Sequence, residues 1–206
     1  MGIYSVKPRF RKMLDGSAAT LAGFGVSPDQ VTTAGIVASA LGALGFAGGR
    51  FSRRAYALVP VSALVRITCN ALDGLVAEKQ GSGRPAGDLY NETADRIEDL
   101  LFLGGAGGVQ GVSPVVALGA VAASQLGSFI GVASKAAGAG RRYDGPMGKA
   151  DRMLVLGSAA LLASWKGPPS VYLNLALAAI GGGGAVTAWN RFHRAHRVLE
   201  SSSPRA

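Results

Sequence analysis

The chain has 206 residues, a length that suits one domain. Hydrophobic residues make up 49% of it and charged residues only 16%, whereas an average soluble domain is ~25% charged. The apolar residues come in blocks of about 17–25 residues, the length that spans a bilayer, and most charges lie between the blocks. We therefore expect an all-α, polytopic membrane protein and exclude an ordinary soluble domain.

The formal net charge of +9 raises the question of an anionic partner. The Lys and Arg residues flank the apolar blocks, with few aromatic residues among them. This pattern favours anionic membrane lipids over nucleic acid, which we do not expect as a partner. The single cysteine, Cys69, excludes an internal disulfide.

The N-terminal region, residues 1–26, is basic and carries large apolar residues at helical spacing. We predict an amphipathic juxtamembrane helix over residues 4–24 that lies on the membrane surface. The alternative is a disordered basic tail.

Ser27 and Pro28 then predict a helix start, with serine as the cap and proline in the first turn. We expect a bundle of six transmembrane helices within residues 27–190, followed by a basic C-terminal tail at 191–206. The expected spans cover residues 31–48, 55–77, 87–109, 114–133, 153–165 and 171–189.

The distribution of Lys and Arg predicts the orientation of these spans. With both termini inside, the inner segments hold most of the basic residues, and the outer loops hold only Arg50, Arg53, Arg54 and Lys166. We therefore expect a protein of the cytoplasmic (inner) membrane whose termini and polar site face the cytoplasm.

Polar residues between positions 70 and 99 interrupt segments that otherwise suit lipid. Asn70 and Asp73 are three residues apart and share a helix face, and Gly81, Gly83 and Pro85 predict a turn after them. On the next helix, five polar residues fall within a stripe of about 100°, namely Asp88, Asn91, Glu92, Asp95 and Asp99.

Two helices would thus direct oxygen ligands into one cavity, which favours Mg²⁺, Mn²⁺ or Ca²⁺. The alternative is a polar seam that Arg66 and Arg96 alone satisfy. A protein that conducts ions along the stripe is a further alternative. It predicts acidic residues at many membrane depths, whereas these cluster near one face.

This stretch resembles the CDP-alcohol phosphotransferase family of integral membrane enzymes, whose pattern is Asp-x2-Asp-Gly-x2-Ala-Arg-x8-Gly-x3-Asp-x3-Asp. The segment from Gly25 to Thr32 also looks like the one that opens the first span in that family. The family's spacing is kept throughout, with Asn70, Asp73, Gly74, Ala77, Glu78, Gly87, Asn91 and Asp95 at its positions.

The resemblance implies that Asn70, Asp73, Asn91 and Asp95 bind two divalent metals, Mg²⁺ or Mn²⁺, and that Asp95 is also the general base. An alcohol would attack the β-phosphate of a CDP-linked lipid such as CDP-diacylglycerol and release CMP, a step of phospholipid synthesis. Members of the family are often homodimers. The residues implied to line the cytidine diphosphate site are Ser27, Pro28, Asp29, Gln30, Gly74, Ala77, Glu78 and Gly87.

Three of these residues depart from the family pattern. Asn70 and Asn91 remove two negative charges, so that one metal is an alternative to two, and Glu78 replaces an arginine that should meet the diphosphate. We expect Glu92 to supply a carboxylate and Arg84, in the turn, to supply the lost cation. Three interpretations follow: an active variant with altered metal use, an enzyme with an altered donor, or a degenerate non-catalytic membrane protein that keeps the fold.

The basic residues after the fourth span resemble the family's acceptor-binding region, with Arg141, Arg142, Lys149 and Arg152 as the expected contacts. Family members that use phosphorylated acceptors carry a Lys-x-Arg pair after a Ser-Gln segment. Here Ser124 and Gln125 are present, but the pair falls on Gly131 and Ala133. The alternative is that the four basic residues only mark the cytoplasmic side.

Overall fold

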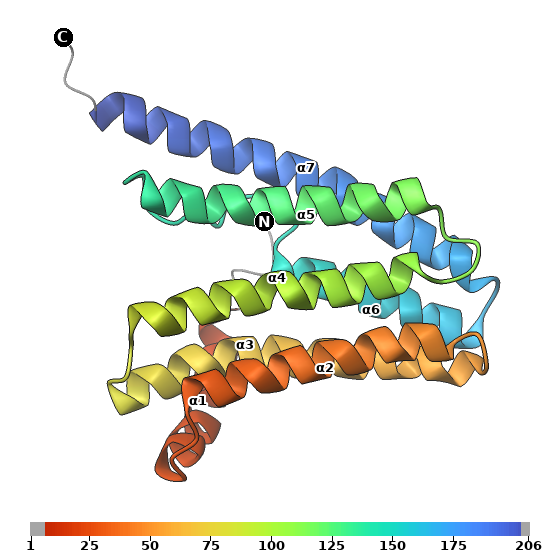
Figure 1. Cartoon of the computed structure of the whole chain (residues 1–206), viewed down its shortest axis with the longest axis horizontal. Coiled ribbons are helices and arrows are strands. Elements are labelled where there is room, and N and C mark those ends of the chain that lie inside the picture. Colours follow the sequence, from red (N-terminus) through yellow and green to blue (C-terminus); the bar gives the residue numbers. More distant parts are fainter. Residues whose placement is uncertain (1–6, 203–206) are drawn as a thin grey trace.

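The computed structural model describes residues 7–202, which form helices and loops and contain no β-strand. Figure 1 shows α2 to α7 side by side along the long axis, as the all-helical expectation requires. The elements are α1 (Lys7–Gly23), α2 (Pro28–Gly48), the short 3-10 helix η2 (Arg53–Ala57), α3 (Leu58–Gln80), α4 (Pro85–Gly107), α5 (Pro114–Ala136), α6 (Lys149–Trp165) and α7 (Pro169–Ser202).

Four helical segments within residues 7–202 are long and apolar enough to cross a membrane. They are Pro28–Gly48, Arg53–Gln80, Pro114–Ala136 and Pro169–Ser201. The other two helices of the bundle fall short, because α4 carries the polar stripe and α6 has only 17 residues. The chain is therefore an integral membrane protein, and the count of six spans stays a prediction.

Local sequence signals hold the two halves of the polar stretch at one end of the bundle. Gly81 ends α3 with a φ of 58°, a left-handed conformation that glycine adopts without strain. Pro85 starts α4 at a position where its missing N–H costs nothing. The turn between the two helices is short, so α3 and α4 run antiparallel and their polar faces meet.

The start of α2 lies at the same end as this turn (Figure 1). It is fixed by a reciprocal cap, in which the Ser27 hydroxyl accepts from the Gln30 N–H at 3.2 Å. The Gln30 side chain accepts from the Ser27 N–H at 2.8 Å. The C-terminal ends of α5 and α7 lie at this end too, whereas η2 and the α6–α7 loop lie at the other. There Arg53 donates to the Lys166 carbonyl at 3.1 Å.

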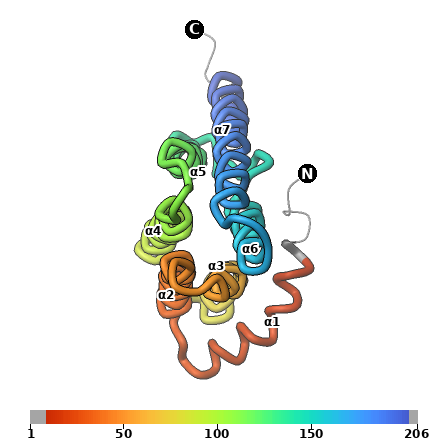
Figure 2. The backbone as a smooth tube through the Cα atoms, turned by 90° about the vertical axis from the view of Figure 1, so that its right-hand side faces the viewer, coloured from red at the N-terminus to blue at the C-terminus, as the bar shows by residue number. Residues whose placement is uncertain are grey.

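Helix α1 lies outside the bundle, next to α3 (Figure 2). Its Ala18 is fully buried in a cluster with Leu72 and Val76 of α3. Two ion pairs add to this contact, Arg11 with Glu78 at 2.9 Å and Asp15 with Lys79 at 2.8 Å. The helix falls within the predicted range 4–24, of which residues 4–6 lie outside the described part. Its place on a membrane surface stays a prediction.

The basic C-terminal tail was expected at 191–206, and the described part of this region is helical, since α7 continues without a break to Ser202. Arg191 is only 7% exposed and binds two carbonyl groups, that of Gly127 at 2.7 Å and that of Asp144 at 3.0 Å. These bonds tie α7 to α5 and to the loop before α6. The residue therefore has a packing role that its place in a basic cluster concealed.

Candidate functional site

Two pairs of side chains cross between α3 and α4, and each joins an amide to a carboxylate. The Asn70 amide donates to Asp95 at 2.8 Å, and the Asn91 amide donates to Asp73 at 2.6 Å. Because the four residues are spaced by three or four positions on their helices, all of them point into the same interface. The structure thus brings the four predicted metal-binding residues together.

Asp73 is 4% exposed, and its remaining contacts are hydrogen bonds. The Thr32 hydroxyl donates to one carboxylate oxygen at 3.1 Å, and the backbone N–H of Gly74 donates to the other at 2.6 Å. Thr32 comes from the first turns of α2, so three helices meet at this carboxylate. Thr32 was not among the predicted site residues, although it lies one helical turn after Pro28.

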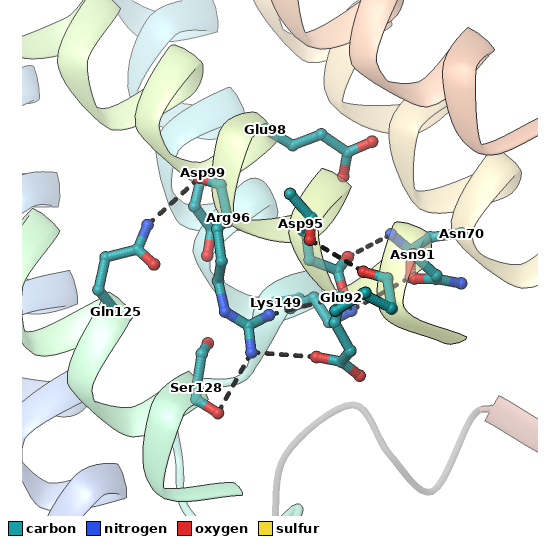
Figure 3. A network of polar contacts seen from close by, with 12 residues as sticks. Asn70, Asn91, Glu92, Asp95, Arg96, Glu98, Asp99, Gln125, Ser128 and Lys149 are labelled. Atoms are coloured by element: carbon teal, nitrogen blue, oxygen red, sulfur yellow. Dashed lines mark hydrogen bonds and ion pairs between the residues drawn. The ribbon is translucent and has the colours of Figure 1, made fainter. Parts of the chain in front are cut away.

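Asp95 is 1% exposed and faces a cation (Figure 3). The Lys149 ammonium, at the start of α6, forms an ion pair with its carboxylate and lies 3.4 Å from the Asn70 amide oxygen. The Arg96 guanidinium lies 3.9 Å away. Lys149 was expected to bind the acceptor. Its separation of 54 residues from Asp95 gave the sequence no means of pairing the two.

A second buried network lies deeper in the bundle than the amide–carboxylate pairs. Arg66 binds Glu98 at 2.7 Å and Asp99 at 2.8 Å, and Arg152 binds Asp99 at 2.6 Å. All four side chains are at most 3% exposed. Glu98 was absent from the predicted polar stripe. Its position three residues after Asp95 places it on the same helix face and was the signal that would have found it.

A cavity of about 260 Å³ opens beside Asp73 and Asn91. We call it the interhelical cavity, because α2, α3 and α4 all contribute to its wall. Its lining includes most residues predicted for the cytidine diphosphate site, namely Ser27, Pro28, Asp29, Gly74, Ala77, Arg84 and Gly87. Thr32, Gln80, Ser82, Gly83 and Asp88 complete it.

Two predicted nucleotide contacts lie elsewhere. The Gln30 side chain caps α2 and is not part of the lining. Glu78 points to the outer side of α3, where it is 69% exposed and pairs with Arg11. Arg84, the expected replacement for the lost cation, does line the cavity and forms an ion pair with Asp29.

Glu92 lies between two arginines, Arg96 at 3.0 Å (Figure 3) and Arg141. The Arg96 guanidinium also donates to the Ser128 carbonyl at 3.3 Å, and its own carbonyl accepts from Gln125 at 3.2 Å. Glu92 therefore helps to join α4 to α5. Its carboxylate is bound by these arginines, and the Arg96 guanidinium also lies 3.9 Å from the Asp95 carboxylate.

The four residues expected to bind the acceptor are mostly engaged with carboxylates of the chain itself. Arg141 pairs with Glu92, Lys149 with Asp95 and Arg152 with Asp99. Arg142 differs, because no carboxylate of the described residues forms an ion pair with it, whereas a buried Nε without a hydrogen-bond partner is common to Arg141, Arg142 and Arg152. These cations do more than mark one side of the membrane, since they hold the start of α6 against α4.

The donor set suits a hard divalent cation in type, because it consists of carboxylate and amide oxygens. A flip of either amide would turn its oxygen towards the neighbouring carboxylate and so towards a shared cation. Only two of the four side chains, Asp73 and Asp95, are carboxylates. Within residues 7–202, no three His, Cys, Asp or Glu side chains are close enough together to hold a metal ion. Any metal here would depend on amide oxygens.

Comparison with known proteins supports a membrane protein of this fold. No family model matches the chain. Inner membrane protein YnbA of Escherichia coli (strain K12) is 29% identical over 164 residues, which cover 76% of this chain and 78% of that protein.

Among solved structures, the chain is similar to phosphatidylinositol phosphate synthase (PgsA1) of Mycobacterium tuberculosis. The structure with CDP-DAG bound has a TM-score of 0.74 and 24% identity, covering 95% of this chain and 99% of that one. The complex with manganese and citrate has a TM-score of 0.73 and 25% identity, covering 93% and 92%. This chain therefore shares the fold of a phospholipid-synthesising membrane transferase, itself a CDP-alcohol phosphotransferase.

Proposed function

We propose that this chain is a membrane-bound CDP-alcohol phosphotransferase, which moves a phosphatidyl (substituted phosphate) group from a CDP-linked lipid to an alcohol. The observation that carries the proposal is the interhelical cavity, where the start of α2 and both halves of the polar stretch form one wall. Similarity to a synthase solved with CDP-DAG and with manganese supports the same function.

In the proposed reaction, the alcohol oxygen forms a bond to the β-phosphorus of the donor. The bond from that phosphorus to the oxygen bridging to CMP breaks, and CMP leaves with the bonding electrons. The alcohol proton passes to the carboxylate of Asp95, which acts as general base. Asp73 and Asn91 would hold a divalent cation, which would supply the positive charge that neutralises the diphosphate and stabilises the leaving CMP.

Arg84 and Asp29 contribute to the donor side of this site. The Arg84 guanidinium presents several N–H donors to the cavity and can bind phosphate oxygens in place of the arginine missing at position 78. Asp29 orients it when the cavity holds no donor. Gly74, Ala77 and Gly87 leave room for the nucleotide, because none of them has a side chain larger than a methyl group.

On the acceptor side, we propose an alcohol that carries no phosphate. Three of the four candidate cations are already paired with carboxylates, and a phosphate would have to displace those carboxylates. Breaking a buried ion pair leaves an unpaired charge, which is costly. Arg142 alone would have to offset that cost.

The test is CMP release by the purified protein in liposomes that contain CDP-diacylglycerol and Mg²⁺ or Mn²⁺. The panel of acceptors pairs each alcohol with its phosphorylated form. We expect CMP release with an unphosphorylated alcohol, dependence on the metal and loss of activity in Asp95→Asn. If no CMP is released with any acceptor, the proposed function is wrong.

A non-catalytic membrane protein is the second candidate, and one observation favours it. The carboxylate of the proposed base, Asp95, is already engaged by two side chains of the chain itself, Lys149 and Asn70. This candidate predicts that CDP-diacylglycerol and Mn²⁺ together leave the melting temperature of the protein unchanged. A transferase that binds both would be stabilised by them.

A further inference from the structure

The inference concerns how many divalent cations the site holds, and it rests on the proposed function for the identity of the site. Four carboxylates are buried within the described part of the chain, namely Asp73, Asp95, Glu98 and Asp99, each at most 4% exposed. Buried charges are normally paired with an opposite charge or bound to a metal. The partners of the four can therefore be compared directly.

Three of the four carboxylates have a cation of the chain itself beside them. Glu98 pairs with Arg66, Asp99 pairs with both Arg66 and Arg152, and Asp95 pairs with Lys149. Glu98 and Asp99 are balanced by the two arginines, so that deeper network is neutral as it stands. It has no need of a further cation.

Asp73 is the exception among these four. No Lys, Arg or His nitrogen of the described residues forms an ion pair with it, and only Thr32, Asn91 and a backbone N–H bind its oxygens. It also lines the interhelical cavity together with Asn91, so a soluble ion can reach it. The Asp73 carboxylate is thus almost fully buried, has no counter-charge within residues 7–202 and can be reached from the cavity. A cation bound there would balance its charge.

The equivalent position beside Asp95 is occupied by the ammonium group of Lys149. The Lys149 ammonium lies on the Asp95 carboxylate and 3.4 Å from the Asn70 oxygen, so it contacts both members of that amide–carboxylate pair. Its position is fixed by the start of α6, where the Asp151 side chain accepts from the Gly148 N–H at 2.9 Å. A divalent cation bound here would have to displace a like charge.

We propose that this site takes one divalent cation, held by Asp73 and Asn91, and that the Lys149 ammonium stands where a second would otherwise bind. The Arg96 guanidinium, 3.9 Å from the same Asp95 carboxylate, places a further positive charge beside the position of that second cation. Like charges held close together in a buried site repel one another strongly.

The test measures Mn²⁺ binding by titration calorimetry and by electron paramagnetic resonance on the purified protein with CDP-diacylglycerol. We expect one Mn²⁺ per chain with the spectrum of an isolated ion. Asp73→Asn should weaken binding by more than about tenfold, since it removes the ligand charge that sets affinity. The double variant Asn70→Asp with Lys149→Met should bind a second Mn²⁺, with the spectrum of a coupled pair.

Lys149→Arg is the matched control, because it keeps the cation and should keep the stoichiometry of one. Two Mn²⁺ ions in the unaltered chain would overturn the inference, and so would no bound Mn²⁺ or binding that survives Asp73→Asn unchanged. CMP release measured on the same sample separates this result from the proposed function. Turnover with two bound ions contradicts only the inference, whereas one bound ion without turnover contradicts only the function.

Discussion

At the scale of single residues, the proposed donor site takes its cation from Arg84 and not from position 78. Glu78, where the family pattern has arginine, lies on the outer side of α3 and pairs with Arg11. Arg84, six residues later in the turn, lines the interhelical cavity. The expectation that Arg84 supplies the missing cation came from charge alone and stays a prediction. Nothing in the sequence indicates that Glu78 binds Arg11 of α1, because the two residues are 67 positions apart in the chain.

Arg84→Ala should weaken CDP-diacylglycerol binding, because it removes the cation that we propose to face the diphosphate. The expected loss is about tenfold or more, given ~1.5–3 kcal/mol for a hydrogen bond to a charged group. Titration of the donor into the purified protein measures it. Arg54→Ala is the control, since Arg54 is exposed at the other end of the bundle. Equal affinities of the two variants would refute this role of Arg84.

Gly74→Leu tests whether the donor nucleotide binds in the interhelical cavity. A Cβ at Gly74 meets no atom within 4 Å, so a larger side chain fits the protein and enters the space proposed for the nucleotide. Leucine also has a higher helix propensity than glycine, so the melting temperature should not fall. We expect donor binding to be lost.

Gly104→Leu is the matched control for that variant. Gly104 is another exposed glycine of a helix, also with no atom within 4 Å of a Cβ, but it lies outside the cavity lining. Donor binding should be unchanged in it. If Gly74→Leu binds the donor as well as Gly104→Leu does, the nucleotide lies elsewhere.

At the scale of elements, ion pairs of two kinds hold the helices around the site. The deeper network of Arg66, Glu98, Asp99 and Arg152 is buried and joins α3, α4 and α6. The pairs between α1 and α3 are exposed. Removing one partner of a buried pair is far more costly than removing one of an exposed pair.

Arg152→Met should therefore destabilise the fold by about 3–5 kcal/mol, because it leaves part of the Asp99 charge uncompensated. Unfolding in a denaturing detergent series gives the free energy. The comparison variant is Lys135→Met, which removes an exposed pair with Asp88 at 3.6 Å and should cost less than ~1 kcal/mol. Similar losses in the two variants would contradict the burial argument.

Charge reversal at Glu78 tests how α1 is held. Glu78→Arg places two arginines together and should increase hydrogen exchange in α1, whereas the exchanged pair Arg11→Glu with Glu78→Arg should restore protection. Hydrogen exchange read by mass spectrometry over Lys7–Gly23 measures both. Protection that stays unchanged in the single variant would show that the apolar contact of Ala18 suffices.

At the scale of the whole molecule, periodicity and hydropathy predicted the helices well. Antiparallel packing of α3 and α4 followed from Gly81 and Pro85. The contacts of Lys149 and Arg191 did not follow, because they join helices distant in sequence and depend on packing that no local pattern encodes. The basic cluster after residue 190 does not by itself indicate that α7 continues to Ser202, since such clusters occur both in helices and in irregular tails.

Sidedness is the remaining property of the whole molecule. The residues expected outside, such as Arg53 and Lys166, contact each other at the end opposite the site. We expect Ser201→Cys to react with an impermeant maleimide only from the cytoplasmic side and Ser52→Cys only from the other, both in a Cys69→Ser background. Labelling of both positions from one side would contradict a cytoplasmic site.

The most direct measurement is a structure of this protein with CDP-diacylglycerol and Mn²⁺, in which anomalous scattering locates the metal. The account predicts the diphosphate in the interhelical cavity beside Arg84, with one Mn²⁺ next to Asp73. Donor density in the groove between α4 and α5, lined by Glu92 and Phe129, would contradict it. So would a metal bound to Asp95 with the Lys149 ammonium displaced.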